Sequence, residues 1–184
     1  MRKSTIALTS AIGGLLFGVL AASSVSSAAG GSSYGEDRAL IENLQARYLF
    51  ALDFHDADLY VTTFTPDGVL DYGTGDVRGR EAIKKVIAGM PGNAAAQETT
   101  GLRPAAGRHH ISNIVLQIDG DQAIGRAYWF HTGNDNPERG SVLGGFGHYE
   151  DELVKVNGEW LFSKRTIYNE GVAEWAAKDG NPAW

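Results

Sequence analysis

The sequence predicts an α+β fold in a single domain. In the first half, apolar residues recur every three or four positions, which is typical of helices. From residue 109 onward they fall into four longer runs separated by short turns, which is typical of hairpin-connected strands. Because helices precede a run of strands, we expect a mostly antiparallel sheet with helices on one face. A length of 184 residues leaves room for one such domain.

Residues 1–28 have the pattern of a signal peptide. A short cationic start precedes an apolar stretch from Thr5 to Ala22, and small residues follow it. Cleavage after Ala28 or after Ala29 fits the small-residue rule equally well. The alternative is an uncleaved anchor, which the glycine and serine content disfavours. We therefore expect a periplasmic or secreted protein with no membrane association after cleavage.

Three helices are expected before the strands. Residues Glu36 to Phe54 form an amphipathic pattern, and Asp56 is placed to cap a short helix from Leu59 to Phe64. The third pattern, Arg80 to Ala88, is closed by Gly89.

The segments between these helices have turn and loop composition. Thr65 to Gly68 is predicted to be a turn, and Val69 to Tyr72 a short strand. Gly92 to Gly107 is rich in small and polar residues, so we expect a mobile surface loop there.

Four long strands are expected in the second half. Their predicted ranges are His109 to Ile118, Gln122 to Thr132, Val142 to Val156 and Glu159 to Ile167. Asp119 to Asp121 and Asn157-Gly158 are the hairpin turns, the second of the tight Asn-Gly kind. We set the domain at residues 36–169. The tail, residues 170–184, is expected to be a short covering helix or a flexible end.

Composition excludes several classes of protein. With 16 Lys and Arg against 22 Asp and Glu, the net charge is −6 and no basic cluster is present, so nucleic acid is not an expected partner. The chain has no cysteine, which excludes disulfides, thiolate catalysis and zinc–sulfur sites. No phosphate-binding loop, nucleophile elbow or paired-histidine metal motif is found, so no cofactor and no metal are expected.

The chain resembles the SnoaL-like branch of the nuclear transport factor 2-like fold. Four stretches in this order carry the resemblance: Tyr48–Asp53 with His55-Asp56, Phe64–Tyr72, Arg108–Asn113, and Gly147–Leu153 with Gly158–Trp160 and Arg165. The resemblance implies a cone-shaped α+β barrel, a curved sheet wrapped on three N-terminal helices. Because this fold hosts enzymes and binding subunits alike, function has to be argued from the site.

Within this branch the sequence is similar to scytalone dehydratase, lindane dehydrochlorinase, bile acid 7α-dehydratase and the diarylpropane lyases that expel formaldehyde. Asp53 and His109 match the Asp and His that these enzymes share, and Tyr72 matches a substrate-polarising Tyr of scytalone dehydratase. Other polar groups of that enzyme's pocket fall on Ala127 and Gly147 and are missing here. The resemblance also implies a homotrimer.

His109 and His110 are neighbours on a strand, so their side chains point to opposite faces. The resemblance selects His109 as the catalytic base. Asp53, bonded to one ring nitrogen, would fix the tautomer and leave the other nitrogen to take a proton. The alternatives are a structural histidine at a strand start and an ordinary helix-end carboxylate.

The remaining candidates are expected to line the pocket. Tyr72 is the third catalytic candidate, because a phenol can donate a hydrogen bond to a developing oxyanion. Ordinary core packing is the alternative for most of the others. The expected substrate-binding residues are Tyr48, Trp129, Tyr149, Asn113 and His131.

These residues together predict a cofactor-independent lyase acting on a hydrophobic, oxygenated aromatic or polycyclic substrate. The leaving group is water or a one-carbon aldehyde. An isomerase or cyclase with the same base, and a non-catalytic exported binding protein, are the alternatives. Separation of Asp53 from His109 by more than about 6 Å would favour the binding protein. Ile124, Tyr128 and Phe130 form an apolar outer sheet face, which supports the expected homotrimer over a dimer or a tail-covered monomer.

Overall fold

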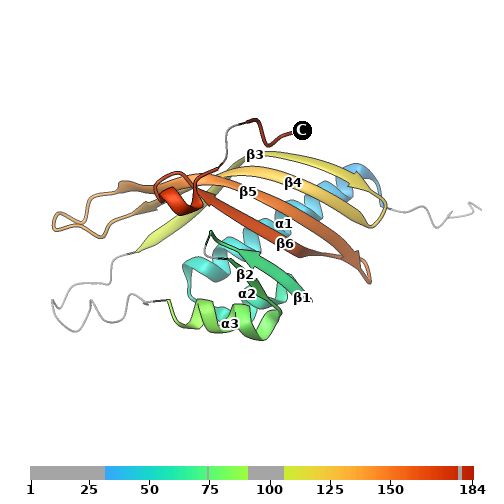
Figure 1. Cartoon of the computed structure of the whole chain (residues 1–184), viewed down its shortest axis with the longest axis horizontal. Helices are drawn as coiled ribbons and strands as arrows, with labels where there is room; N and C mark the ends of the chain where they lie inside the picture. The colour runs from blue at the N-terminus through green and yellow to red at the C-terminus, as the bar shows by residue number, and fades with distance from the viewer. Residues whose placement is uncertain (1–31, 74, 91–105, 178–179) are drawn as a thin grey trace, which may run out of the picture. The chain divides into compact units, whose positions relative to one another are not determined.

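The computed structural model describes residues 32–73, 75–90, 106–177 and 180–184. The predicted signal peptide and nearly all of the predicted loop 92–107 lie outside these residues. Within them the α+β prediction is confirmed: one six-stranded, curved sheet carries its helices on one face (Figure 1). No described helix combines the length and the apolar character needed to cross a bilayer.

The sheet has the order β2-β1-β6-β5-β4-β3. Every neighbouring pair is antiparallel except β1 and β6, which run parallel. The strands are β1 (Phe64–Asp71), β2 (Asp76–Arg78), β3 (Gly107–Asp119), β4 (Gln122–Gly133), β5 (Val142–Val156) and β6 (Glu159–Asn169). The helices are α1 (Tyr34–Asp53), α2 (Ala57–Thr62), α3 (Arg80–Ala88) and a single turn, η1 (Ala173–Trp175).

Helix α1 is fixed at both ends by local chemistry. Ser33 caps its first turn in a reciprocal capping box with Glu36, so the helix begins two residues before the predicted start. At the other end His55 adopts a left-handed conformation (φ 56°), and the chain turns directly into α2. Asp56 caps α2 as predicted, by accepting a hydrogen bond from the Leu59 amide. Asp53 is therefore held as the last residue of α1.

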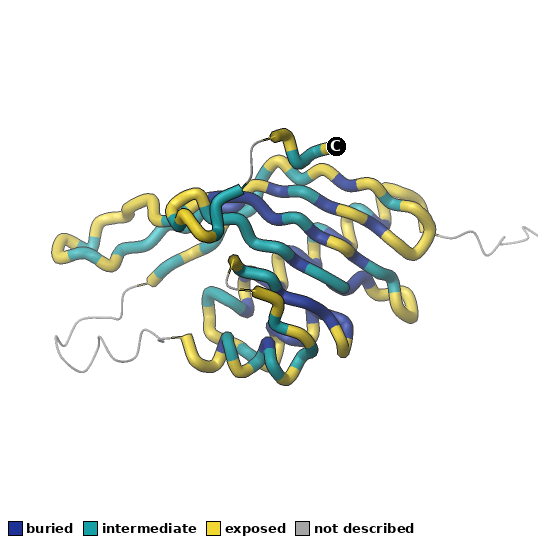
Figure 2. The backbone as a smooth tube through the Cα atoms, viewed as in Figure 1, coloured by how far each residue is buried: buried dark blue, intermediate teal, exposed yellow. Residues whose placement is uncertain are grey.

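The core lies between the inner sheet face and the helices. Helix α1 packs on β3 and β6, while α2 and α3 pack on each other and on β1 (Figure 1). Buried and exposed residues alternate along the central strands, as Figure 2 shows. Inside the core, Arg165 and Asp151 form a fully buried two-contact ion pair at 2.7 and 2.8 Å.

The predicted turn at Thr65–Gly68 is wrong. These residues lie inside β1, at a register shift against β6 between Phe64 and Val69. Pro66 has no amide hydrogen and so cannot donate a hydrogen bond to the neighbouring strand. The turn-forming residues therefore produce an irregularity within the strand, and the chain does not reverse its direction there. The short strand β2 was not predicted, because three residues with no buried member carry no periodic signal. The four long strands and α3 lie where the sequence placed them, within two residues.

Candidate active site

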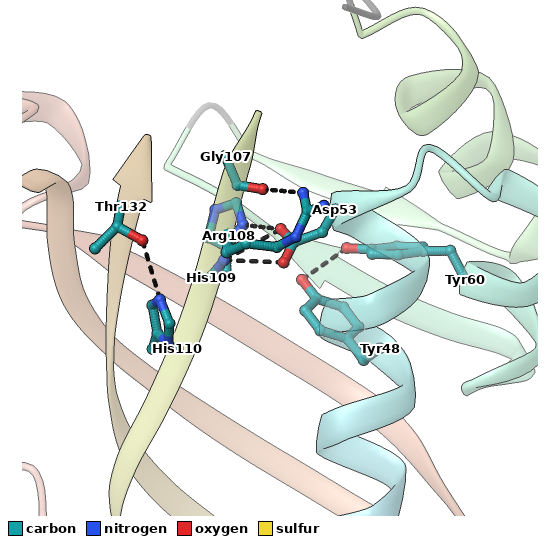
Figure 3. A network of polar contacts seen from close by, with 8 residues as sticks. All are labelled: Tyr48, Asp53, Tyr60, Gly107, Arg108, His109, His110 and Thr132. Carbon is teal, nitrogen blue, oxygen red and sulfur yellow. Dashed lines mark hydrogen bonds and ion pairs between the residues drawn. The ribbon is translucent and has the colours of Figure 1, made fainter. Parts of the chain in front are cut away.

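Asp53 and His109 meet although 56 residues separate them in the sequence (Figure 3). Asp53 Oδ1 lies 2.6 Å from His109 Nδ1, and both carboxylate oxygens accept the His109 backbone amide at 3.0 and 3.2 Å. The Asp53 side chain is only 7% exposed, and that of His109 is 24% exposed. Because a carboxylate accepts hydrogen bonds, this contact assigns the ring proton to Nδ1 and leaves the Nε2 lone pair free.

His110 lies on the other face of β3, as the sequence predicted (Figure 3). Its Nε2 is 3.0 Å from Thr132 Oγ1, and its ring stacks on Phe130 at 4.7 Å between centroids. The side chain is exposed on the outer face of the sheet. His110 therefore lies on the same strand as His109, but its side chain points to the opposite face and does not contact Asp53.

The ring of His109 borders an apolar cavity of about 170 Å³, which we call the inner cavity. It lies between α1, α2, α3 and the inner sheet face. Four of the residues predicted from the sequence line it together with His109. The full lining is Tyr48, Leu52, Tyr60, Leu70, Tyr72, Val86, Met90, His109, Trp129, Tyr149, Ile167, Asn169 and Trp175.

A second, more polar cavity of about 240 Å³ lies on the other side of His109, and we call it the outer cavity. It is bordered by the end of α1 and by the adjoining ends of β3 and β4. The two cavities share Leu52 and His109. The outer cavity is lined by Leu52, Asp53, His55, Ala106, Gly107, His109, His131, Gly133 and Asp135.

The tyrosine hydroxyls that border the inner cavity differ in their hydrogen bonding. The Tyr60 hydroxyl donates to that of Tyr48 at 2.7 Å, so this pair is satisfied (Figure 3). The Tyr149 hydroxyl has no hydrogen-bond partner within the described residues. Burial, followed by the neighbouring Tyr48, raises the pKa of Tyr149 well above its usual value. Tyr149 therefore remains a neutral phenol and a hydrogen-bond donor at physiological pH.

The Arg165 guanidinium lies beneath these tyrosines. Its carbon is 4.2 Å from the ring centre of Tyr48 and 4.1 Å from that of Tyr149. Burial opposes the charge of Arg165, but Asp151 outweighs burial and raises its pKa, so the cation persists. The cation and its paired carboxylate fix both aromatic rings at the floor of the cavity.

Aromatic walls complete the inner cavity. The Trp129 ring lies nearly parallel to that of Tyr149, and its Nε1 donates to the Tyr168 carbonyl at 2.9 Å. Tyr72 packs edge-on against Trp175 of η1, with ring centres 5.4 Å apart. Gly73 makes room for Trp175, since a side chain there would collide with the indole. Sequence reasoning had placed Trp175 only in a covering tail, so its part in the cavity wall was missed.

Asn113 does not lie in the cavity, contrary to the prediction. A β-bulge between Ser112 and Val115 shifts the register of β3, and Asn113 adopts a left-handed φ of 52° at this point. Its side chain is exposed and borders the outer sheet face beside Tyr128. Ile114 turns inward in its place and packs against the core.

No group of three or more acidic or histidine side chains with metal-binding geometry occurs within the described residues. A further hollow of about 1000 Å³ is an open groove on the outer sheet face. None of the predicted site residues lines it. The predicted site residues other than Asn113 therefore gather at the Asp53–His109 pair and its two cavities.

Comparison with known proteins bears on the family and the fold of this chain. The profile of the SnoaL-like domain family matches residues 34–166. The chain belongs to the SnoaL-like family. Its structure has the nuclear transport factor 2-like, or cystatin-like, fold that solved members display.

One protein is similar to this chain in sequence, and two solved structures are similar to it in fold. An uncharacterized protein of Mycobacterium tuberculosis is 28% identical over 131 residues, which cover 70% of this chain and 82% of that protein. A Catenulispora acidiphila protein solved with S-DNPA is 24% identical, with a TM-score of 0.59 over 74% of this chain and 96% of its own. A Novosphingobium aromaticivorans protein provisionally assigned as a scytalone dehydratase is 24% identical, with a TM-score of 0.57 over 80% and 93%.

Proposed function

We propose that the protein is a cofactor-independent lyase for a hydrophobic, oxygenated aromatic substrate. The observation that carries this proposal is the 2.6 Å contact between Asp53 and His109 at the border of an aromatic-lined cavity. The contact is far inside the separation of about 6 Å beyond which a simple binding protein would be the better explanation. A binding protein has no use for a buried carboxylate that orients an imidazole.

In the proposed reaction His109 Nε2 removes a proton from the substrate, and Asp53 stabilises the imidazolium that forms. For a dehydration, the electron pair of the broken C–H bond forms a C=C bond, the C–O bond breaks, and the His109 imidazolium returns its proton to the departing oxygen so that water leaves. For release of a one-carbon aldehyde, a hydroxyl proton is removed instead, the electron pair of the O–H bond forms the C=O bond of the aldehyde, and the C–C bond breaks. The remaining carbon keeps the electron pair of that bond and takes the proton back from the imidazolium. In both cases the hydroxyls of Tyr149 and Tyr72, which line the inner cavity, would donate hydrogen bonds to a substrate oxygen that gains charge there.

The two cavities favour a compact substrate. Each is smaller than the roughly 300 Å³ of a typical drug-sized ligand site. The aromatic lining of the inner cavity suits a single ring system that carries one oxygen facing Tyr149 and Tyr72, and the polar outer cavity suits a second oxygen function of the substrate. An isomerase or cyclase with the same base would use the same two cavities.

The test is turnover, by purified protein, of a panel of hydroxylated aromatic compounds that runs from single-ring to diaryl and polycyclic members. No metal or nucleotide is added, and the protein is first dialysed against a strong chelator. We expect elimination products that accumulate without any cofactor. Turnover that is lost on dialysis and restored by a divalent ion would contradict the cofactor-free proposal, and rearranged products of unchanged mass would favour an isomerase.

We also propose that the chain is exported and cleaved after Ala28 or Ala29, as its first 28 residues predict. The compact unit Gly31–Trp184 contains the whole site, so cleavage would leave it intact. Intact mass measured on protein recovered from outside the cytoplasm tests this. A full-length mass with the initial residues retained would contradict it.

A further inference from the structure

His131 on β4 lies directly across the strand pair from His109 on β3. The two imidazole rings are 4.7 Å apart between centroids and tilted by 52°. Both rings line the outer cavity, but only His109 also borders the inner one. A substrate whose ring fills the inner cavity would therefore pass His109 before its polar end reaches His131.

Three glycines make room for the His131 ring. An added Cβ at Gly107 would lie 2.1 Å from His131 Nε2, and one at Gly144 would lie 2.8 Å from Nδ1. At Gly133 the nearest ring atom, Cε1, would be 3.2 Å away. None of the three has a positive φ, so the backbone does not require glycine there. Because glycine within strands is destabilising, we attribute these positions to the space that the ring needs.

The ring of His131 has free hydrogen-bonding capacity. Neither of its nitrogens forms a hydrogen bond within the described residues, in contrast to His109 and His110. The ring is only partly buried and lines the outer cavity, so its nitrogens are available to a ligand there. A ligand atom in the outer cavity can form the hydrogen bond that no described residue forms with the His131 ring.

The charge state of His131 differs from that of a free histidine. Burial, and next the neighbouring His109, lower its pKa, whereas Asp53 acts in the opposite direction. The ring is therefore neutral near pH 7. The ionisable groups around it are His109 and His110 on β3, Asp53 on α1, and His55 and Asp135 at the cavity wall.

We propose that His131 is a second catalytic residue, whose neutral imidazole donates a hydrogen bond to the substrate oxygen held in the outer cavity. The inference rests on the proposed lyase function, and it assigns the substrate a ring in the inner cavity and an oxygen within reach of His131. The division of roles follows from the geometry. His109 takes up the proton because Asp53 stabilises its charge, and His131 binds oxygen because no carboxylate contacts its ring.

The first test does not depend on turnover. Binding of benzyl alcohol and of toluene, which differ by one hydroxyl group, is measured by NMR titration of the protein and of His131→Phe. We expect the variant to bind benzyl alcohol about 5-fold more weakly, the equivalent of roughly 1 kcal/mol for one net hydrogen bond. Toluene affinity should change less than 2-fold. Equal losses for both ligands, or no loss for benzyl alcohol, would overturn the proposal.

His110→Phe is the matched control, because it changes the neighbouring histidine on the opposite face of the sheet. It should leave both affinities unchanged, and an equal effect there would contradict a role specific to His131. Gly107→Ala is a second route to the same result. Its new methyl group must displace the His131 ring, so it should reproduce the loss for benzyl alcohol even if His131→Phe folds poorly.

The second test uses the substrate found by the panel. We expect His131→Phe to lower kcat/KM by about 100-fold, as is usual when one donor to a reacting oxygen is removed. His131→Asn, which can still donate, should recover part of the loss. If the wild type turns over nothing, the proposed function fails while the ligand pair still decides the role of His131. If the wild type is active and His131→Phe equals it, the inference alone fails.

Discussion

At the scale of single residues, the tyrosine hydroxyls that border the inner cavity differ in whether another protein group pairs with them. The Tyr60 hydroxyl donates to that of Tyr48 at 2.7 Å, whereas the Tyr149 hydroxyl forms no hydrogen bond with another described residue and belongs to a side chain that lines the inner cavity. A phenol hydroxyl that the protein leaves unpaired beside a cavity can donate a hydrogen bond to a ligand there. Tyr149 is therefore the residue most clearly prepared for a substrate oxygen.

We expect Tyr149→Phe to lower kcat/KM by about 100-fold, because a donor to the reacting oxygen is lost. Its free energy of unfolding should change by less than about 1 kcal/mol, since no protein hydrogen bond is removed. Tyr60→Phe is the matched control and should lower the free energy of unfolding by about 1 kcal/mol, because it breaks the bond to Tyr48. Urea unfolding and steady-state kinetics on both variants check this, and a large destabilisation by Tyr149→Phe would contradict it.

At the level of elements, the first turn of α1 is tied to the far strands of the sheet. Asp37, 4% exposed, lies 2.5 Å from Lys155 Nζ on β5 and accepts from Trp160 Nε1 on β6 at 2.7 Å. Burial opposes the charge, but the donors Lys155, Ser32 and Trp160 outweigh burial and lower the pKa of Asp37. This anchor fixes the start of the helix whose last residue is Asp53.

Asp37→Asn should therefore reduce the free energy of unfolding at pH 7 by about 2 kcal/mol, because hydrogen bonds to a charged group are lost. The folded pKa is below the unfolded value of about 3.9, so the stabilisation exists above that pH and disappears as pH falls through the folded pKa. Denaturant unfolding at pH 7 and at pH 3 should thus show a smaller gap between wild type and variant in acid.

The control for Asp37 is Asp58→Asn, which changes an exposed carboxylate paired with Lys84. An exposed pair of this kind contributes little, so the control should differ from wild type by less than about 1 kcal/mol at both pH values. A gap for Asp37→Asn that stays constant between pH 7 and pH 3 would show that its charge does not contribute.

The prediction from sequence assumed that side chains along a strand alternate strictly between the two faces of the sheet, and this assumption explains both its successes and its errors. It placed His109 and His110 on opposite faces, and Trp129 and Tyr149 on the inner one, because these stretches are regular. It failed for Asn113, where a bulge inserts an extra residue, and bulges leave no periodic mark in a sequence. The Thr65–Gly68 stretch failed because local turn chemistry was overruled by the pairing of β1 with β6.

The parts of the site that sequence did not reveal depend on long-range packing. The turn η1 contributes Trp175 to the cavity wall because this side chain packs against Gly73, which lies about a hundred residues earlier in the sequence. Likewise the glycine cradle of His131 is visible only when three strands are brought side by side. Asp53 and His109, by contrast, were paired through resemblance, and periodicity contributed only the face on which each lies.

At the scale of the whole molecule, the outer sheet face carries exposed aromatic side chains that an assembly of subunits would bury. Tyr128 and Phe146 are more than half exposed there, at 56% and 52%. The final residues of the chain lie on the same face, where Arg126 Nε donates to the Pro182 carbonyl at 3.1 Å. The tail therefore covers part of this face and leaves the aromatic part uncovered.

We propose that the uncovered part is buried between subunits of a homotrimer. Tyr128→Glu should then shift the protein toward monomers, because it would place an unpaired charge in a dry interface. Sedimentation at micromolar concentration measures this. Phe50→Glu, at an exposed aromatic residue of α1, is the control and should leave the assembly unchanged. A wild-type protein that sediments as a single species of monomer mass would exclude the trimer.

The central claim is that the Asp53–His109 pair performs the chemistry, and turnover by His109→Ala and His110→Ala measured side by side tests it most directly. The two histidines are adjacent, but only His109 contacts Asp53 and the cavities. We expect His109→Ala to lose turnover by at least about 100-fold while its thermal unfolding remains cooperative, and His110→Ala to retain most activity. An active His109→Ala protein, or an inactive but folded His110→Ala protein, would contradict the account.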